Sequence, residues 1–362
     1  MSDGSFVQTY RETYKGRFPT ALHGQRHPLA ALSHPSSPLA LEISPDGTLI
    51  AVANRDFTVD LWRLSNMETR ERQLSGHGSG VVCLSFSQDS RFLASGSADG
   101  KLCIWDLAKG SRIHLIEQDG EITRTGFSPD STSIFVISLN GRPGERAMLR
   151  VWGIPADSSP LSVRFTCKEP FEVATFSSDG TRIAAMTKDG LFEIHDATSG
   201  ALLSSGSAEM HPSSIVLSSG TNLMAVSNGL HIQLWNLLGT PVRTAEMEVE
   251  RKDRTHALSI SPNGRYLIHG STVWGIERAS AIEDAPLWHH LPRALHQYRK
   301  GPGSLLSYED GWIYSAHPRG PLVQIPSYYD IHSGTPWRAY GPKVVFAPED
   351  KIVVVDCSTL LR

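Results

Sequence analysis

LSGHGSGVVCLSFSQDSRFLASGSADGKLCIWDL, residues 74–107, contains three short apolar runs separated by two turn sequences. Within residues 82–86 apolar side chains alternate with smaller or polar ones, as in a strand with one buried face. Residues 87–90 and 98–100 are rich in Asp, Gly and Ser, which favour tight turns. The stretch therefore predicts a unit of short antiparallel strands.

This unit opens with Gly76-His77 and closes with Trp105-Asp106. In this it resembles the WD-repeat (β-transducin-like) family, whose repeat is one four-stranded blade of a β-propeller. The resemblance implies a structural chain of hydrogen bonds through a His, a strand hydroxyl, a turn Asp and the closing Trp, whose donors and acceptors can satisfy one another in series. The matching residues are His77, Ser95 (or Ser97, on the same face), Asp99 and Trp105 here, and His34, Asp56 and Trp62 in the preceding unit, where Ala51 and Ala53 replace the hydroxyl.

A closing aromatic recurs along the chain at a regular spacing. It occupies positions 62, 105, 152, 195, 235 and 274, at intervals of 43, 47, 43, 40 and 39, with His195 where Trp is expected. A repeat of about 40–45 residues is typical of the family. The predicted repeats are about 33–64, 74–107, 116–154, 165–200, 211–238 and 255–277.

The spacing ends after Trp274, and a divergent last blade is predicted within residues 311–357. A strand from residues 27–32 is expected to complete that blade, as in many members of the family. We predict an all-β fold, a single closed propeller over residues 25–357, after a lead-in of residues 1–24. Seven four-stranded blades are expected, with eight as the alternative, because Val355 lies 81 residues beyond Trp274.

Composition and motifs exclude several functions. A net charge of −3 gives no general electrostatic reason to bind nucleic acid or an anionic membrane. None of the four cysteines forms a CxxC pair, and we find no signal peptide or apolar span. We therefore expect a cytoplasmic location, with a nuclear one left open, and no membrane insertion. No Walker loop, GxGxxG, HExxH or GxSxG motif occurs, so no catalytic residue, cofactor, metal or small-molecule substrate is expected.

The resemblance favours a non-enzymatic scaffold that presents one propeller face to protein or peptide partners. The alternatives are a quinoprotein-like or other channel-based propeller enzyme, and a degenerate sensor fragment of a fungal receptor. The receptor-fragment alternative is based on residues 311–357, which are similar to the C-terminal segment of basidiomycete WD-repeat proteins. In the family, partner contacts lie at the start of the first strand and just before the turn Asp. The corresponding residues are Ser37, Leu39, Arg55, Val82, Glu121, Thr123, Glu172, Lys188, His211, Arg254 and His256.

Overall fold

The computed structural model describes most of the chain up to Glu248 and separate strands beyond it. Every regular element in this part of the chain is a β-strand, and none of it forms an apolar helix long enough to cross a membrane. The predicted lead-in lies outside the described residues. The described ranges are 29–33, 38–64, 66–118, 120–140, 148–155, 161–167, 169–218, 222–248, 258–260, 266–269, 272–276, 280–281, 306–309, 312–316, 319–324, 337–340, 343–346 and 351–356.

Five sheets of four consecutive antiparallel strands come first along the chain. The first is β2 (Pro38–Ile43), β3 (Leu49–Asn54), β4 (Thr58–Arg63) and β5 (Asn66–Ser75). The second is β6 (Val81–Phe86), β7 (Phe92–Ser97), β8 (Lys101–Asp106) and β9 (Ser111–Glu117). The third is β10 (Gly120–Phe127), β11 (Ser133–Asn140), β12 (Met148–Gly153) and β13 (Ser162–Cys167). The fourth and fifth are β14 (Phe171–Phe176), β15 (Arg182–Thr187), β16 (Leu191–Asp196) and β17 (Leu202–Ser207), then β18 (Ser214–Leu217), β19 (Leu223–Ser227), β20 (His231–Asn236) and β21 (Val242–Glu248).

Three further sheets follow. The sixth has four strands, β22 (Leu258–Ile260), β23 (Tyr266–His269), β24 (Thr272–Gly275) and β25 (Ser280–Ala281). The seventh has three, β26 (Leu306–Glu309), β27 (Trp312–Ala316) and β28 (Arg319–Gln324). The eighth has four, in the order β1 (Leu29–Ser33), β31 (Lys351–Asp356), β30 (Lys343–Phe346) and β29 (Trp337–Tyr340).

The predicted count of seven blades is not confirmed, because the described strands form eight sheets. The difference lies after Trp274, in the segment that the sequence analysis treats as one divergent blade. Strands β27 and β28 pair in one sheet, whereas β30 and β31 pair in another. The segment thus holds parts of two sheets, although no closing aromatic at the earlier spacing marks the boundary.

The predicted N-terminal strand does join the last sheet. Strand β1 pairs with β31 in antiparallel register, from Leu29 opposite Val355 to Ser33 opposite Lys351. Residues from the two ends of the described chain therefore share one sheet, in which β1 is the outermost of four strands.

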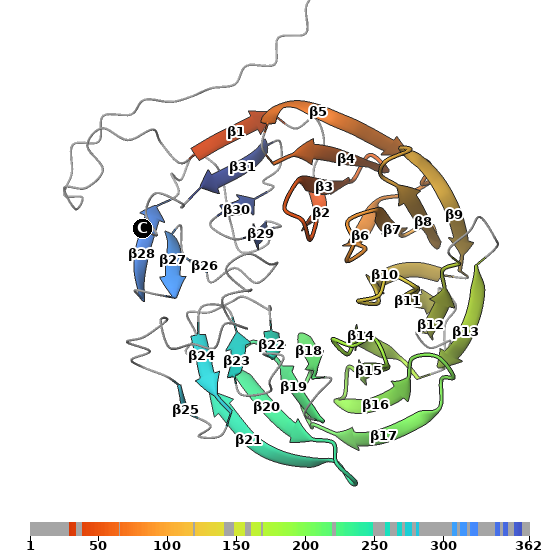
Figure 1. Ribbon diagram of the computed structural model, residues 1–362, viewed down its shortest axis with the longest axis vertical. Helices are drawn as coiled ribbons and strands as arrows, with labels where there is room; N and C mark the ends of the chain where they lie inside the picture. The colour runs from red at the N-terminus through yellow and green to blue at the C-terminus, as the bar shows by residue number, and fades with distance from the viewer. Residues whose placement is uncertain are drawn as a thin grey trace, which may run out of the picture.

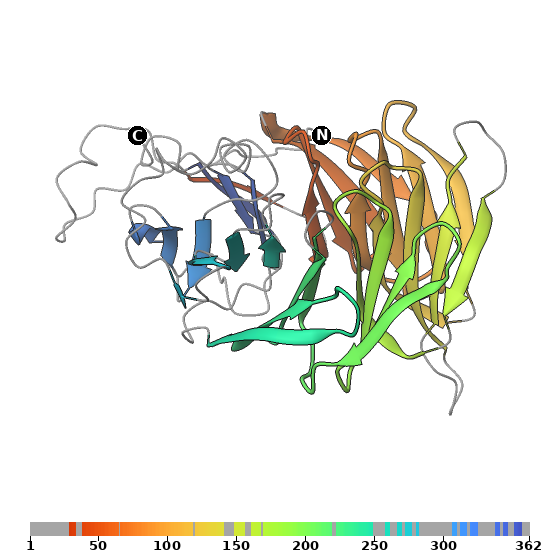
Figure 2. The ribbon, with the colours of Figure 1, turned by 60° about the horizontal axis from the view of Figure 1, so that its bottom comes forward.

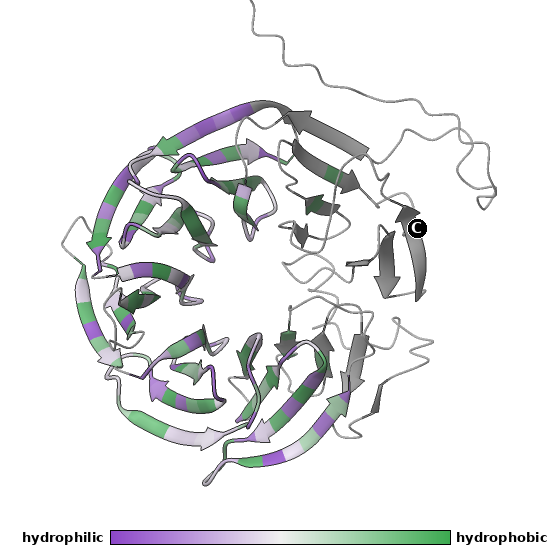
Figure 3. Cartoon of the chain, turned by 180° about the vertical axis from the view of Figure 1, so that it is seen from behind, coloured by the Kyte–Doolittle hydropathy of each residue, from purple (hydrophilic) through white to green (hydrophobic). Residues whose placement is uncertain are grey.

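The sheets are arranged around a common centre, and the innermost strand is the first of each sheet along the chain except in the eighth, where it is β29 and β1 is outermost (Figure 1). Inner strands of successive sheets contact one another from β29 through β2, β6, β10, β14 and β18 to β22. In the tilted view of Figure 2 the sheets stand side by side around this centre. An outermost strand such as β5 is largely hydrophilic, whereas the strands inside it carry hydrophobic residues (Figure 3).

The hydrophobic core lies between neighbouring sheets. Phe192 of β16 meets Trp235 of β20 edge to face, with ring centroids 5.2 Å apart. Val345 and Val354 of the eighth sheet pack in one cluster with Ile50 of the first. Because burying each such side chain stabilises the fold by about 1.5–3 kcal/mol, successive sheets hold one another in place.

A buried Ser begins the turn between the first two strands in each of the first four sheets. Its hydroxyl donates to the Asp two residues on, at 2.5–2.6 Å, and accepts the backbone N–H five residues on. This pairing makes four turns alike although their other residues differ. The serines are Ser44, Ser87, Ser128 and Ser177.

Candidate functional site

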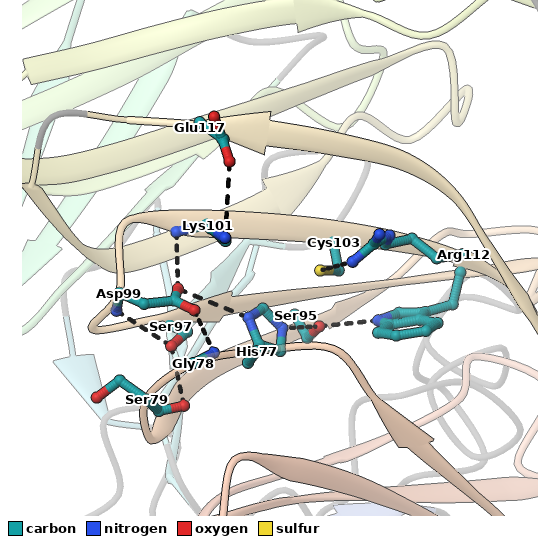
Figure 4. Close-up of polar contacts among 11 residues, drawn as sticks. His77, Gly78, Ser79, Ser95, Ser97, Asp99, Lys101, Cys103, Arg112 and Glu117 are labelled. Carbon is teal, nitrogen blue, oxygen red and sulfur yellow. Dashed lines mark hydrogen bonds and ion pairs between the residues drawn. The ribbon is translucent and has the colours of Figure 1, made fainter.

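Three side chains of the second sheet form a buried hydrogen-bonded chain (Figure 4). His77 Nε2 and Trp105 Nε1 each lie 2.8 Å from Ser95 Oγ, and Ser95 is fully buried. Because an indole N–H can only donate, Ser95 accepts from Trp105 and is free to donate to His77 Nε2. In that arrangement His77 carries its proton on Nδ1. The chain ties the entry of the blade to its second and third strands.

Asp99 lies beside His77, as the family pattern implies, but without a direct hydrogen bond to it. Its carboxylate accepts backbone N–H groups of Gly78, at 2.5 Å, and Lys101, at 2.9 Å. It lies 3.8 Å from His77 Nδ1, which is beyond hydrogen-bond length. Burial acts to raise the pKa of Asp99, but hydrogen bonds from Gly78, Lys101 and Ser97 outweigh it and lower that pKa. Asp99 therefore holds the turn and sets the electrostatic environment of His77.

Other sheets lack the hydroxyl at the position of Ser95. Strand pairing places Ile50 opposite Trp62 as it places Leu93 opposite Trp105, so Val52 occupies the equivalent position. The prediction of Ala51 and Ala53 there is wrong, because it is one residue out of register and those alanines project from the other face of β3. The same register gives Val136, Ala185 and Val226 in the third, fourth and fifth sheets.

The structure describes two of the three remaining predicted network residues, Asp56 and Trp62. Asp56 accepts the hydroxyl of Thr58 at 2.6 Å and so holds its own turn. Trp62 is buried in the cluster between the first and eighth sheets. His34 lies outside the described residues.

A β-bulge occurs at the same place in the inner strand of the first four sheets. In the pairing of β2 with β3, for example, the register passes from Pro38 to Ala40 and leaves one extra residue between them. Bulges of this kind re-aim a side chain and are common beside functional sites. The four extra residues are all among the predicted partner contacts: Leu39, Val82, Thr123 and Glu172.

The bulges and the turns between second and third strands lie at the same end of each sheet, because the first two strands are antiparallel. Like ends of neighbouring sheets meet there. His211 Nδ1 lies 2.6 Å from the carbonyl oxygen of Lys188 in the preceding sheet, and because a carbonyl only accepts, Nδ1 donates. A Cβ built on Gly80 would lie 3.1 Å from Leu39 Cδ1 of the sheet before it.

We call this end the bulge face; it consists of the predicted partner residues that the structure describes. Leu39, Val82 and Thr123 are half-buried there. Ser37, Arg254 and His256 lie outside the described residues. The exposed members carry both signs of charge: Arg55, Glu121, Glu172, Lys188 and His211.

One cluster of ligand-type side chains escaped the sequence analysis. Cys167 of β13 lies beside Glu193 and His195 of β16, with one potential ligand atom from each within 4.8 Å of the others. Cys167 belongs to a different sheet, so no sequence spacing connects it to the other two. The available signal was Glu193 and His195 at i and i+2 of one strand, which places both on the same face.

The fold and its repeated features define a class of protein, the β-propeller. Solved structures agree with this. The β-propeller domain of Myceliophteria thermophila Cps50 (Swd1) has a TM-score of 0.59 at 14% identity, over 90% of this chain and 99% of that one. A chain of the Mitotic Checkpoint Complex has a TM-score of 0.52 at 16% identity, over 69% of this chain and 74% of that one.

Within this class, the family model "WD domain, G-beta repeat" matches residues 26–63 and 68–106. Eukaryotic translation initiation factor 3 subunit I of Aspergillus terreus is 28% identical over 180 residues, which are 48% of this chain and 53% of that protein. Human apoptotic protease-activating factor 1 is 32% identical over 30% of this chain and 9% of its own length. The chain thus spans about half the length of the translation factor subunit. Residues 26–63 and 68–106 are WD repeats, and the relatives support a WD-repeat family.

Proposed function

We propose that this chain is a non-enzymatic scaffold whose bulge face binds a protein or peptide partner. The observation that carries the proposal is the bulge repeated in four consecutive sheets at predicted contact positions. The comparisons support the same class of function. One relative is a subunit of a translation initiation factor, and one structural neighbour is part of a checkpoint complex.

The proposal rests on how a bulge changes an inner strand. An extra residue is not held in the ladder, so its side chain can be directed to the end of the sheet rather than into the core. The sheets behind it are fixed by their packing, so a partner gains contacts without an ordering cost in the scaffold. Because Arg55 and Lys188 share the face with Glu121 and Glu172, the proposed partner surface is polar and carries charges of both signs.

The proposal includes a closed ring of eight blades. The sheet β26–β28 is proposed to complete the circle between β22–β25 and the sheet that contains β1 and β31. A closed ring keeps the bulges of separate blades at fixed distances, which is what a shared binding face requires.

The test places a photo-crosslinking amino acid at one position at a time. Arg55, Glu172 and Lys188 report on the bulge face, whereas Gln88 and Thr198, both exposed in turns at the opposite end, are the matched controls. We expect crosslinks from the first three positions to one and the same partner in native lysate, identified by mass spectrometry. Equal crosslinking from Gln88 and Thr198, or different products at every position, would contradict the proposal.

A charge-reversal pair tests the cationic part of the face. Arg55→Glu combined with Lys188→Glu is expected to weaken capture of an acidic partner and to leave thermal unfolding unchanged, since both side chains are exposed. Lys109→Glu with Arg243→Glu makes the same change of charge away from the bulge face. Unaltered capture by the first pair would exclude Arg55 and Lys188 from the contact.

No feature of the described residues favours the channel-enzyme alternative. The cluster of Cys167, Glu193 and His195 lies on β13 and β16, the fourth and third strands of their sheets, and not on the inner strands that surround the centre. The similarity to fungal receptor segments stays a prediction.

A further inference from the structure

Cys167, Glu193 and His195 converge between the third and fourth sheets. His195 Nε2 lies 2.9 Å from Glu193 Oε2 and 3.6 Å from Cys167 Sγ. His195 stands opposite Ile183, the register position that Trp105 occupies in the second sheet. The imidazole has therefore replaced the closing indole, and its ring stacks on Phe165 of the neighbouring sheet, with centroids 5.9 Å apart.

The proton positions around His195 leave two acceptors facing each other. Its Nδ1 lies 3.1 Å from the carbonyl oxygen of Gly200, which can only accept, so Nδ1 carries a proton. In a neutral imidazole Nε2 then bears a lone pair that points at the Glu193 carboxylate. Such a pair of acceptors at 2.9 Å needs either a proton between them, on the imidazole or on the carboxyl group, or a metal cation.

The set of donors matches a borderline-soft divalent cation. Thiolate, imidazole and carboxylate are the side chains that bind Zn²⁺, and His ligands commonly donate their other ring nitrogen to a backbone carbonyl, as His195 does. With ordinary Zn–S and Zn–N bond lengths, a tetrahedral site separates sulfur and nitrogen by about 3.6 Å, close to the distance found here. The Glu193 oxygen has to withdraw by about 0.5 Å from Nε2, which its partly exposed side chain permits.

We propose that Cys167, Glu193 and His195 bind Zn²⁺ and thereby join the outer strand of one blade to the third strand of the next. Three protein ligands leave a fourth position for water. Burial and the Glu193 charge raise the pKa of the Cys167 thiol to about 11, so the thiol is protonated without the cation. Binding of Zn²⁺ forms the metal–sulfur bond and releases the thiol proton to solvent.

The experiment uses Co²⁺ as a spectroscopic probe and Zn²⁺ as its competitor, with the full chain. We expect one equivalent of Co²⁺ to give a thiolate-to-metal charge-transfer band that Zn²⁺ abolishes. Cys167→Ser is expected to remove the band, and Glu193→Gln to weaken Zn²⁺ binding by at least about 100-fold, because even outer-shell changes cost about 10–100-fold. Cys83→Ser, another buried free cysteine, and His114→Gln are the matched controls and should keep the band.

The alternative is a hydrogen bond between the imidazole and the Glu193 carboxyl group without any metal. It predicts no charge-transfer band and no rise in melting temperature on addition of Zn²⁺, and that result would overturn the proposal. A band that persists in Cys167→Ser, or that disappears equally in Cys83→Ser, would also overturn it. Far-ultraviolet circular dichroism of each variant confirms that the fold is retained. The metal-binding experiment and the crosslinking test concern different residues, so either proposal can fail without the other.

Discussion

Replacement of Ser95 by Ala tests whether the buried chain in the second sheet stabilises the fold. The hydroxyl serves His77 and Trp105 at 2.8 Å each, and no solvent reaches it. Its removal leaves two buried polar groups without this partner, and each such group costs about 1–3 kcal/mol. We expect Ser95→Ala to lower the free energy of unfolding by about 2–4 kcal/mol, a large share of the ~5–15 kcal/mol of a typical domain.

Urea denaturation followed by circular dichroism measures this loss. Ser205→Ala, at an exposed position of β17, is the control and should change the free energy of unfolding by less than about 0.5 kcal/mol. Combination with Trp105→Phe isolates the coupling, because Ser95→Ala should cost less once the indole donor is gone. A loss below about 0.5 kcal/mol, or strict additivity of the two changes, would refute the reasoning.

Three further outcomes follow from the same contacts. Trp235 Nε1 has no hydrogen-bond partner among the described residues, and Val226 occupies the position that Ser95 has in the second sheet. Val226→Thr offers the indole an acceptor there, so it should raise the free energy of unfolding by up to about 1 kcal/mol in urea denaturation. A lower free energy of unfolding would show that the hydroxyl does not reach the indole. Ser131 has φ +59°, so Ser131→Gly should raise the melting temperature by relieving about 1 kcal/mol of strain, partly offset by glycine's greater freedom when unfolded. Burial lowers the pKa of His77 from 6.5, so the unfolded chain binds the extra proton first as pH falls. The free energy of unfolding should therefore decrease below about pH 6.5, and it should decrease less steeply in His77→Gln. Equal pH profiles of the two proteins would contradict this.

Much of the fold was predictable because its determinants are local. The period-two runs and the Ser-x-Asp turns recur within short stretches, and each of the six closing aromatic positions falls in the third strand of a separate sheet. The number of blades was not predictable, because β26–β31 follow a stretch without the spacing of the earlier repeats. There the sheet of β27 and β28 is separate from the sheet of β30 and β31, and no closing aromatic at the earlier spacing marks the boundary between them.

Only part of the candidate site could be predicted from the sequence, again because only some of its determinants are local. The positions on the bulge face follow from the repeat register, but the bulges themselves do not, because Leu39 and Glu172 have nothing in common as side chains. A bulge is a mismatch of length between two strands and not a preference of one residue. The cluster around His195 was missed for a related reason, since Cys167 reaches it from another sheet.

The pairing of β1 with β31 has a consequence for how this protein is made. Residues 29–33 emerge from the ribosome before their partners at 351–356, and every other described strand lies between the two in the sequence. During translation the nascent chain therefore carries an open sheet edge at its beginning, and such edges invite wrong pairing. Assembly of the eighth sheet waits until β31 has been synthesised, and a ribosome-stalled chain that lacks β31 should be a better substrate for chaperones than a chain that contains it.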